Sequence, residues 1–256
     1  MRPAPVTLFP LPDVPLIEPG DDLGAILASA IVRSGMSLQD DDILVVAQKI
    51  VSKAEGRYVA LGSVAPSPRA MEIAARTGKD PRYVEVVLSQ SEEIIKVGPR
   101  VVVAAHRLGF VMANAGIDES NICRQEGDER VLLLPADPDG SAGRLKEWLD
   151  ASFGVSIGVI VNDSFGRPWR NGVVGVALGA AGLPALLDRV GAPDLFGRKL
   201  KTTEIAFADE VASAASILMG QVAEGRPAVL VRGLHWDAPA RPAAALIRSR
   251  ERDLFR

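Results

Sequence analysis

Two short, almost wholly apolar runs constrain the fold of this chain more than any other feature. They are residues 43–47 (ILVVA) and 155–161 (VSIGVIV), and neither alternates polar with apolar residues. Runs of this kind are typical of strands that are buried on both faces of a sheet. Polar residues follow each run at once, Gln48-Lys49 after the first and Asn162-Asp163-Ser164 after the second. The sequence therefore predicts two buried strands, each leading into a polar cluster.

Helical and strand-like segments alternate along the rest of the chain. In residues 22–34 the apolar side chains have helical spacing, with Asp21 or Asp22 placed to cap the helix and Gly35 placed to end it. Further helices are expected at 69–77, 82–89, 141–151 and 202–219, and further strands at 94–97, 100–105, 108–113, 131–134 and 228–232. The small apolar residues of 172–182 are expected to be buried, in the core or between subunits.

These elements predict an α+β fold in which mixed sheets are combined with helices. The neighbouring strands between residues 94 and 113 favour a meander. We expect one domain over residues 1–237, which allows for two subdomains, and a C-terminal tail over residues 238–256 that is rich in Arg, Ala and Pro.

Composition narrows the range of partners. A net charge of −3 and 5% aromatic residues argue against nucleic acid and against an anionic membrane surface. The single cysteine, Cys123, permits neither an internal disulfide nor a cysteine-based zinc site, which fits a reducing, cytoplasmic setting. The N-terminal residues lack a signal-peptide pattern, and the chain has no apolar run long enough to span a bilayer.

The common catalytic signatures are missing from the sequence. It contains no GxxxxGK[ST] phosphate loop, no GxGxxG after a strand, no HExxH and no GxSxG. The two histidines, His106 and His235, are far apart, and we expect them at the surface or at strand ends rather than in a catalytic triad. Chemistry is therefore expected from polar clusters that lie just past the apolar strands.

The first two clusters suit a phosphate and a cation. Lys49 and Lys53 follow the strand at 43–47, where their amines can reach phosphate, although a solvated strand edge gives the same pattern. The segment 114–121 combines a turn-forming glycine with Asp118 and Asn121. This loop can supply a cation ligand and a carboxamide for a base or ribose, or it can be turn chemistry alone.

The other two clusters also contain residues that suit a cation and a phosphate. Asp163 and Ser164 supply the carboxylate and hydroxyl oxygens that Mg²⁺ prefers, and Arg167 and Arg170 follow them closely. This grouping favours a metal-bound polyphosphate, and a structural ion pair of an arginine with Asp163 or Glu204 is the alternative. After the helix at 202–219, Gln221 offers another oxygen ligand in a loop whose glycines also suit simple helix capping.

Together these clusters resemble the gamma-glutamyl ligase family that builds the tail of coenzyme F420. The resemblance covers about residues 11–233 and rests on long segments: VPLIEPGDDL, QKIVSKAEGR, NAGIDESN, NDSFGRPWRNG and TEIAFADEVASAASILMGQ, followed by VRG. It implies a GTP-dependent ligase with two divalent ions, Mg²⁺ or Mn²⁺, and a K⁺ requirement. It also implies an intertwined homodimer on the family's own α+β fold.

The resemblance assigns roles position by position. It places the first metal on Asp118 and Asp163 and the second on Ser164 and Gln221. It assigns to the GTP site Val14, Pro15, Leu16, Ile17, Gln48, Lys49, Lys53, Asn121, Met219, Gly220, Gln221, Val222, Ala223, Glu224, Gly225 and Arg226. Two residues depart from the family pattern: Gln48 stands where serine is expected, and Ser164 where threonine is common.

The implied reaction activates a carboxylate. The lactyl carboxylate of F420-0 attacks the γ-phosphate of GTP, and the amine of L-glutamate then displaces phosphate from the acyl phosphate. A second glutamate added through a γ-carboxylate is a further implication. We expect Arg167 and Arg170 to act as catalytic residues on the acceptor or on the phosphoryl group. Two alternatives remain: another nucleotide- and metal-dependent phosphoryl-transfer enzyme, and a non-catalytic nucleotide-binding regulator.

Overall fold

A five-stranded mixed sheet forms the centre of the protein, in the order β1-β12-β2-β8-β9. The computed structural model describes residues 5–122 and 129–253, so Cys123 lies outside the described residues. Strands β2 and β8 run parallel, and the other neighbours pair antiparallel. The strands are β1 (Thr7–Pro10), β2 (Ile43–Ala47), β8 (Gly158–Arg167), β9 (Arg170–Ala181) and β12 (Ala228–Arg232). The buried strand expected at 43–47 and the strand expected at 228–232 are confirmed.

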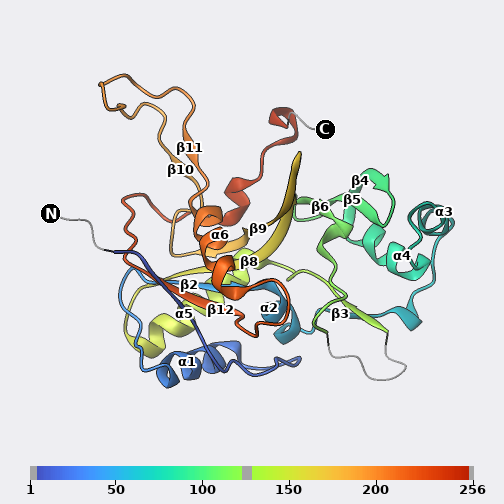
Figure 1. Ribbon diagram of the computed structural model, residues 1–256, viewed down its shortest axis with the longest axis horizontal. Coiled ribbons are helices and arrows are strands. Elements are labelled where there is room, and N and C mark those ends of the chain that lie inside the picture. The colour runs from blue at the N-terminus through green and yellow to red at the C-terminus, as the bar shows by residue number, and fades with distance from the viewer. Residues whose placement is uncertain (1–4, 123–128, 254–256) are drawn as a thin grey trace.

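Helices cover both faces of this sheet (Figure 1). On one face, α1 (Leu23–Arg33), the short α2 (Gln48–Ala54) and α5 (Pro138–Phe153) pack against Val159 and Val161. On the other face, α6 (Phe207–Met219) packs against Ile160 through a row of alanines. Asp22 caps α1 by accepting a hydrogen bond from the Ala25 amide, as its position predicts. Both faces of the sheet are therefore buried, which explains the apolar runs.

A second group of elements has a hydrophobic core of its own. Strands β4, β5 and β6 form the expected antiparallel meander, and β3 pairs with β7. Figure 1 shows this group at one side of the central sheet. Its elements are β3 (Tyr58–Ala60), α3 (Pro68–Thr77), α4 (Pro81–Ser89), β4 (Ser91–Gly98), β5 (Val101–His106), β6 (Val111–Ala113) and β7 (Arg130–Leu132).

Two expected boundaries are wrong, and one stretch expected to be buried is buried only in part within the single chain. Strand β8 does not stop at residue 161 but continues to Arg167, because it pairs with β9 in a long hairpin. In β9 the stretch from residue 177 to 180 is buried, whereas residues 170–173 are exposed, so the apolar stripe is only partly covered. Helix α6 begins at Phe207 rather than 202, since β11 (Glu204–Ile205) pairs with β10 (Leu187–Asp188).

Two further segments lie outside these two groups of elements. Strands β10 and β11 form the base of a projecting arm (Figure 1) whose tip carries Leu195 and Phe196, 99% and 95% exposed. The C-terminal segment, by contrast, packs back onto the protein. Asp139 of α5 accepts hydrogen bonds from the amides of Ala180 and Ala243, each 2.8 Å long, and so joins this segment to β9. No helix in the part of the chain that the structure describes is long and apolar enough to cross a membrane.

Candidate functional site

A cavity of about 660 Å³ opens where β2 and β8 leave their parallel pairing. Ala47, the last residue of β2, lies opposite Asn162, so Gln48 and Asp163 emerge side by side at this edge. Ligands of α/β proteins bind at such carboxyl ends of parallel strands. The residues expected in the GTP and metal sites all line the cavity: Val14, Pro15, Leu16, Ile17, Gln48, Lys49, Lys53, Asp118, Asn121, Asp163, Ser164 and the loop 219–226.

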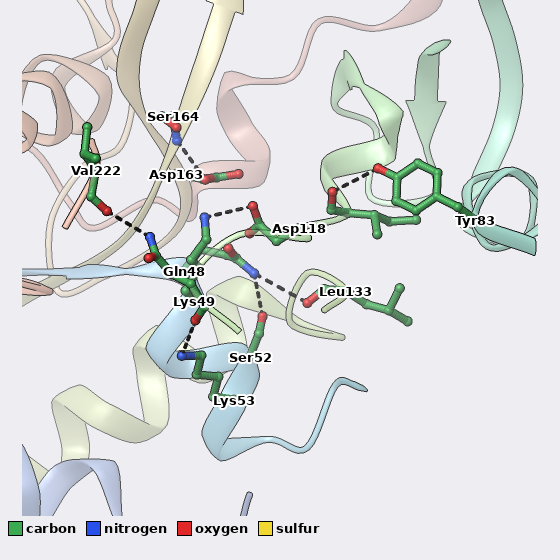
Figure 2. A network of polar contacts seen from close by, with 12 residues as sticks. Gln48, Lys49, Ser52, Lys53, Tyr83, Asp118, Leu133, Asp163, Ser164 and Val222 are labelled. Carbon is green, nitrogen blue, oxygen red and sulfur yellow. Dashed lines mark hydrogen bonds and ion pairs between the residues drawn. The ribbon is translucent and has the colours of Figure 1, made fainter. Parts of the chain in front are cut away.

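Lys49 and Asp118 form the ion pair at the centre of the site. Helix α2 begins directly after β2, and this places the Lys49 amine 2.8 Å from Oδ1 of Asp118 (Figure 2). Two backbone hydrogen bonds with Leu132, both 2.9 Å, hold Asp118 in place. The second carboxylate oxygen, Oδ2, is buried and has no hydrogen-bond partner among the described residues. Burial raises the pKa of Asp118, and the charge of Lys49 opposes this shift.

Asp163 adds a second carboxylate beside this pair. Its Oδ1 accepts a hydrogen bond of 2.8 Å from the Ser164 amide. Burial, and secondarily the charge of Asp118, raises the pKa of Asp163 to about 7. Two crowded carboxylates, one with an unpartnered oxygen, are stabilised by a cation. The residues therefore fit a divalent metal ion.

The remaining ligands for such an ion are neutral oxygens. Among residues 5–122 and 129–253 there is no group of three or more His, Cys, Asp or Glu side chains placed to hold a metal. The Ser164 hydroxyl and the Gln221 carboxamide line the same cavity as the two aspartates. Carboxylates completed by hydroxyl and amide oxygens suit Mg²⁺ or Mn²⁺ rather than a soft metal.

Hydrogen bonds join two loops that are distant in sequence at the wall of the cavity. The Lys53 amine donates to the Asn121 carbonyl at 2.7 Å, and the Asn121 side chain donates to the Val222 carbonyl at 3.1 Å. Glu224 in turn accepts a hydrogen bond from the Val222 amide. Gly220 has a φ of +75°, a backbone conformation that favours glycine in this loop. Asn121 therefore ties the loop at 114–121 to the loop after α6.

Gln48 has a buried, unpaired acceptor oxygen at the wall of the cavity. Its side chain is 1% exposed, and its amide nitrogen donates to the Ser52 hydroxyl at 2.7 Å and to the Leu133 carbonyl at 3.4 Å (Figure 2). Its carbonyl oxygen is buried without a hydrogen-bond partner among the described residues. A serine at this position would offer a hydroxyl donor to an anion. The substitution thus changes the kind of contact that this position can make.

Asn162 has the same property, although it is not among the site residues predicted from sequence. It is buried, and its amide nitrogen donates to the Ser216 hydroxyl at 3.1 Å, while its carbonyl oxygen is unpartnered among the described residues. Asn162 also lines the cavity. A carboxamide directly after a run of buried apolar residues is a signal that could have identified it.

Helix α6 fixes the β8–β9 hairpin that carries Asp163. The pairing skips Leu178, because Val161 lies opposite Gly179 and Asn162 lies opposite Ala177. Asp209 accepts a hydrogen bond of 2.9 Å from the Ala177 amide next to this bulge.

The same helix contacts the hairpin one step further along β9. The Ser213 hydroxyl donates to the Gly175 carbonyl at 2.7 Å. A β-carbon on Gly175 would lie 2.4 Å from the Ala212 carbonyl, so only glycine permits this close packing.

Arg167 and Arg170 are not among the residues that line the cavity. They pair with each other at the end of the β8–β9 hairpin, where Arg167 also donates to the Asn171 carbonyl at 3.3 Å. Arg167 shares the face of β8 that carries Asp163, about 13 Å further along the strand at 3.3 Å per residue. The alternative partner Glu204 lies instead 3.8 Å from Arg252.

Comparisons with known proteins agree on one family. Residues 13–233 match the family described as F420-0:Gamma-glutamyl ligase. Coenzyme F420:L-glutamate ligase of Methanothermobacter thermautotrophicus is 48% identical over 98% of this chain and 99% of its own length. The enzymes of that name from Methanopyrus kandleri and Archaeoglobus fulgidus are 48% and 44% identical, over 96% and 98% of this chain and 96% of each relative.

Proposed function

The chain belongs to the F420-0:gamma-glutamyl ligase family, and from this membership we propose that it joins L-glutamate to the lactyl carboxylate of coenzyme F420-0 with conversion of GTP to GDP. The observation that carries the proposal is the convergence of Asp118, Asp163 and Lys49 in one cavity at the ends of β2 and β8. This arrangement suits phosphoryl transfer, which depends on charge neutralisation and alignment more than on a covalent residue.

The cavity suits a nucleoside triphosphate. Its volume of about 660 Å³ lies within the range of small-ligand sites. Lys49 and Lys53 supply two cations for phosphate oxygens, and Leu16, Ile17 and Val222 supply apolar surface for a base. We assign GTP to the cavity residues that the sequence analysis gives to the GTP site. Asn121 links the loop at 114–121 to the loop after α6.

The metal assignment follows the donor set. A first divalent ion would be held by Asp118 and Asp163, and a second by Ser164 and Gln221. Bound Mg²⁺ or Mn²⁺ supplies charge neutralisation on the transferring phosphoryl group. The proposal includes K⁺ on the strength of the family resemblance alone and assigns no residue to it.

The reaction then has two steps. The lactyl carboxylate oxygen attacks the γ-phosphorus of GTP, the bond to the β,γ-bridging oxygen breaks, and GDP leaves. The uncharged amine of glutamate attacks the acyl carbon, inorganic phosphate leaves, and the nitrogen loses a proton to form the amide. Lys49 and Lys53 hold the phosphate oxygens in line, and Arg167 or Arg170 contacts an anionic group of the acceptor. Repetition on a γ-carboxylate would extend the tail by a second glutamate.

A homodimer is part of the proposal. The arm tip leaves Leu195 and Phe196 almost fully exposed, and Val173 of β9 is 50% exposed. Exposed apolar groups on a projecting hairpin favour contact with a second copy of the chain. We expect light scattering at micromolar concentration to give twice the mass of 27.1 kDa, and a stable monomer would contradict this part of the proposal.

The decisive experiment is mass spectrometry of F420-0 incubated with the protein, GTP, Mn²⁺ and L-glutamate. A ligase yields F420-0 with one or more added glutamyl residues, and it releases GDP and phosphate only when both acceptor and glutamate are present. A phosphorylated acceptor formed without glutamate would indicate a kinase instead. No stoichiometric GDP release under any condition would indicate a nucleotide-binding regulator.

A further inference from the structure

The two lysines that the proposed function gives to the GTP phosphates already have partners within the protein. Lys49 and Lys53 are four residues apart on α2, so their side chains lie on one face of this helix. The Lys49 amine lies 2.8 Å from Oδ1 of Asp118 (Figure 2). The Lys53 amine donates a hydrogen bond of 2.7 Å to the Asn121 carbonyl. One face of α2 therefore holds both ends of the segment from residue 118 to residue 121.

This segment carries part of the proposed metal site. Asp118 is a carboxylate that the proposed function gives to the first divalent ion, and Lys49 contacts one of its two oxygens. The other oxygen, Oδ2, is buried and has no hydrogen-bond partner among the described residues. An ion bound to Oδ2 would be a close neighbour of the Lys49 ammonium, because both would contact one carboxylate. The ammonium and the ion therefore compete for Asp118.

Charge and burial decide how this competition ends. The Lys49 side chain is 26% exposed and that of Asp118 is 20% exposed, so bulk water screens their charges only in part. Without nucleotide, the ammonium repels a divalent ion at Asp118 and weakens its binding. Phosphate oxygens in the cavity offer the ammonium a different anion. Nucleotide binding therefore removes the main obstacle to the ion.

We propose that Lys49 takes the place of the divalent ion in the empty site and moves to the GTP phosphates when nucleotide binds, which leaves Asp118 to the ion. This inference rests on the proposed function, because it takes GTP and a divalent ion as the ligands. It makes Lys49 the residue that couples the binding of these two ligands. By linkage, the ion must tighten the binding of nucleotide by the same factor.

Calorimetry of Mn²⁺ binding tests this coupling without turnover. The Kd for Mn²⁺ is measured at pH 8 on the full-length chain, alone and with a saturating GTP analogue that has an imido group between its β- and γ-phosphates. Lys49→Met removes the charge and keeps a side chain of similar shape. We expect it to lower the Kd for Mn²⁺ alone about 10-fold or more. Lys49→Arg keeps the charge and should stay within about 3-fold of wild type.

A second variant guards against misfolding of the first. Lys49→Met leaves the Asp118 carboxylate without its ion-pair partner, so circular dichroism and Tm are measured for each protein. Lys49→Gln removes the charge but keeps a hydrogen-bond donor for Asp118. It should lower the Kd for Mn²⁺ alone in the same way as Lys49→Met.

The effect of the analogue is compared between variants, because nucleotide phosphates also bind Mn²⁺ directly in every one of them. The factor by which the analogue lowers the Kd for Mn²⁺ should be at least about 10 times larger in wild type than in Lys49→Met. Lys53→Met is the matched control, since it removes the same charge from the same face of α2 but from a lysine that holds a backbone carbonyl. It should weaken binding of the analogue and change the Kd for Mn²⁺ alone less than about 3-fold.

The possible results separate this inference from the proposed function. If Lys49→Met and Lys49→Gln bind Mn²⁺ alone no more tightly than wild type, the inference is overturned, because Lys49 then orients Asp118 instead of competing for it. A Lys49→Arg variant that behaves like Lys49→Met also overturns it, since the charge then has no role. Intact coupling without glutamylation of F420-0 overturns the proposed reaction alone. A wild type that binds neither Mn²⁺ nor the analogue overturns both.

Discussion

Replacement of Asp163 by asparagine should make the metal-free protein more stable and the enzyme much slower. Burial and the charge of Asp118 disfavour the ionised carboxylate, so the folded-state pKa of about 7 lies well above the ordinary aspartate value of 3.8. At about 1.4 kcal/mol for each tenfold change in proton affinity, the ionised carboxylate destabilises the metal-free fold by at most about 4 kcal/mol. Asparagine keeps the shape and removes the charge, so Asp163→Asn should recover much of this free energy.

The sign of the pH dependence follows from the direction of the shift. The folded protein holds a proton on Asp163 that the unfolded chain releases near the ordinary aspartate pKa of 3.8. Stability is therefore lost as the pH rises from about 4 through about 7, and it changes little above that. The advantage of Asp163→Asn should be below 1 kcal/mol at about pH 4 and largest near pH 8.

Urea unfolding in chelator-treated buffer at several pH values measures this difference. Glu72→Gln on α3 removes one exposed carboxylate far from the cavity and serves as the charge control. Added Mn²⁺ should stabilise wild type and the control but not Asp163→Asn, because ligands stabilise only the state that binds them.

Turnover of Asp163→Asn should fall at least ~100-fold, the scale of a lost electrostatic contact. Near-normal turnover at saturating Mn²⁺ would refute the metal assignment. A variant less stable than wild type at pH 8 without metal would refute the electrostatic reasoning.

Three further predictions concern other parts of the protein. Lys53→Ala should raise the KM for GTP or lower kcat with little change in Tm. Unchanged GTP kinetics in both Lys49→Ala and Lys53→Ala would show that these lysines are solvent-exposed side chains at a strand edge and do not contact GTP. Arg170→Lys keeps the charge but not the paired donors, so it should raise the KM for acceptor or glutamate, or lower kcat; wild-type kinetics for it and for Arg167→Lys would reject this role. Burial, together with the charges of Arg107 and Arg57, lowers the pKa of His106 from 6.5 to about 4. As the pH falls from 7.5 to 5, the free energy of unfolding of wild type should therefore drop by about 2 kcal/mol more than that of His106→Asn. Parallel pH profiles of the two proteins in urea titrations would contradict this.

The sequence predicts best where a local pattern decides the structure. The run at 43–47 is confirmed as a strand because burial on both faces leaves no polar position in it. Asp22 is confirmed as the cap of α1 because capping depends on residues three apart. His106 is confirmed at a strand end, although it is buried there rather than exposed.

The failures involve strand pairing, which a local pattern does not encode. Nothing local shows that β8 continues past residue 161, because its partner β9 lies beyond the turn. The start of α6 was predicted too early because Glu204–Ile205 pairs with Leu187–Asp188 in the arm. The N-terminal strand β1 was missed, since four residues that end in proline give almost no strand signal.

The site shows the same division. The family resemblance predicts its residues, and the structure brings the metal and GTP candidates to one cavity. The bulge at Leu178 and the contact of Asp209 with Ala177 were not found. They depend on the packing of α6 across the hairpin, which no spacing in the sequence encodes.

The strand order β1-β12-β2 has a consequence for biosynthesis of the chain. Strand β12 lies between the two N-terminal strands, and residue 7 pairs with residue 232. During synthesis from the N-terminus, both N-terminal strands therefore wait with open edges until almost the whole chain has left the ribosome. Such long-range pairing makes folding slow and exposes strand edges to other chains. A nascent chain cut short before residue 228 would lack the strand that joins β1 to β2, so truncated products should aggregate or be degraded rather than persist as partly active enzyme.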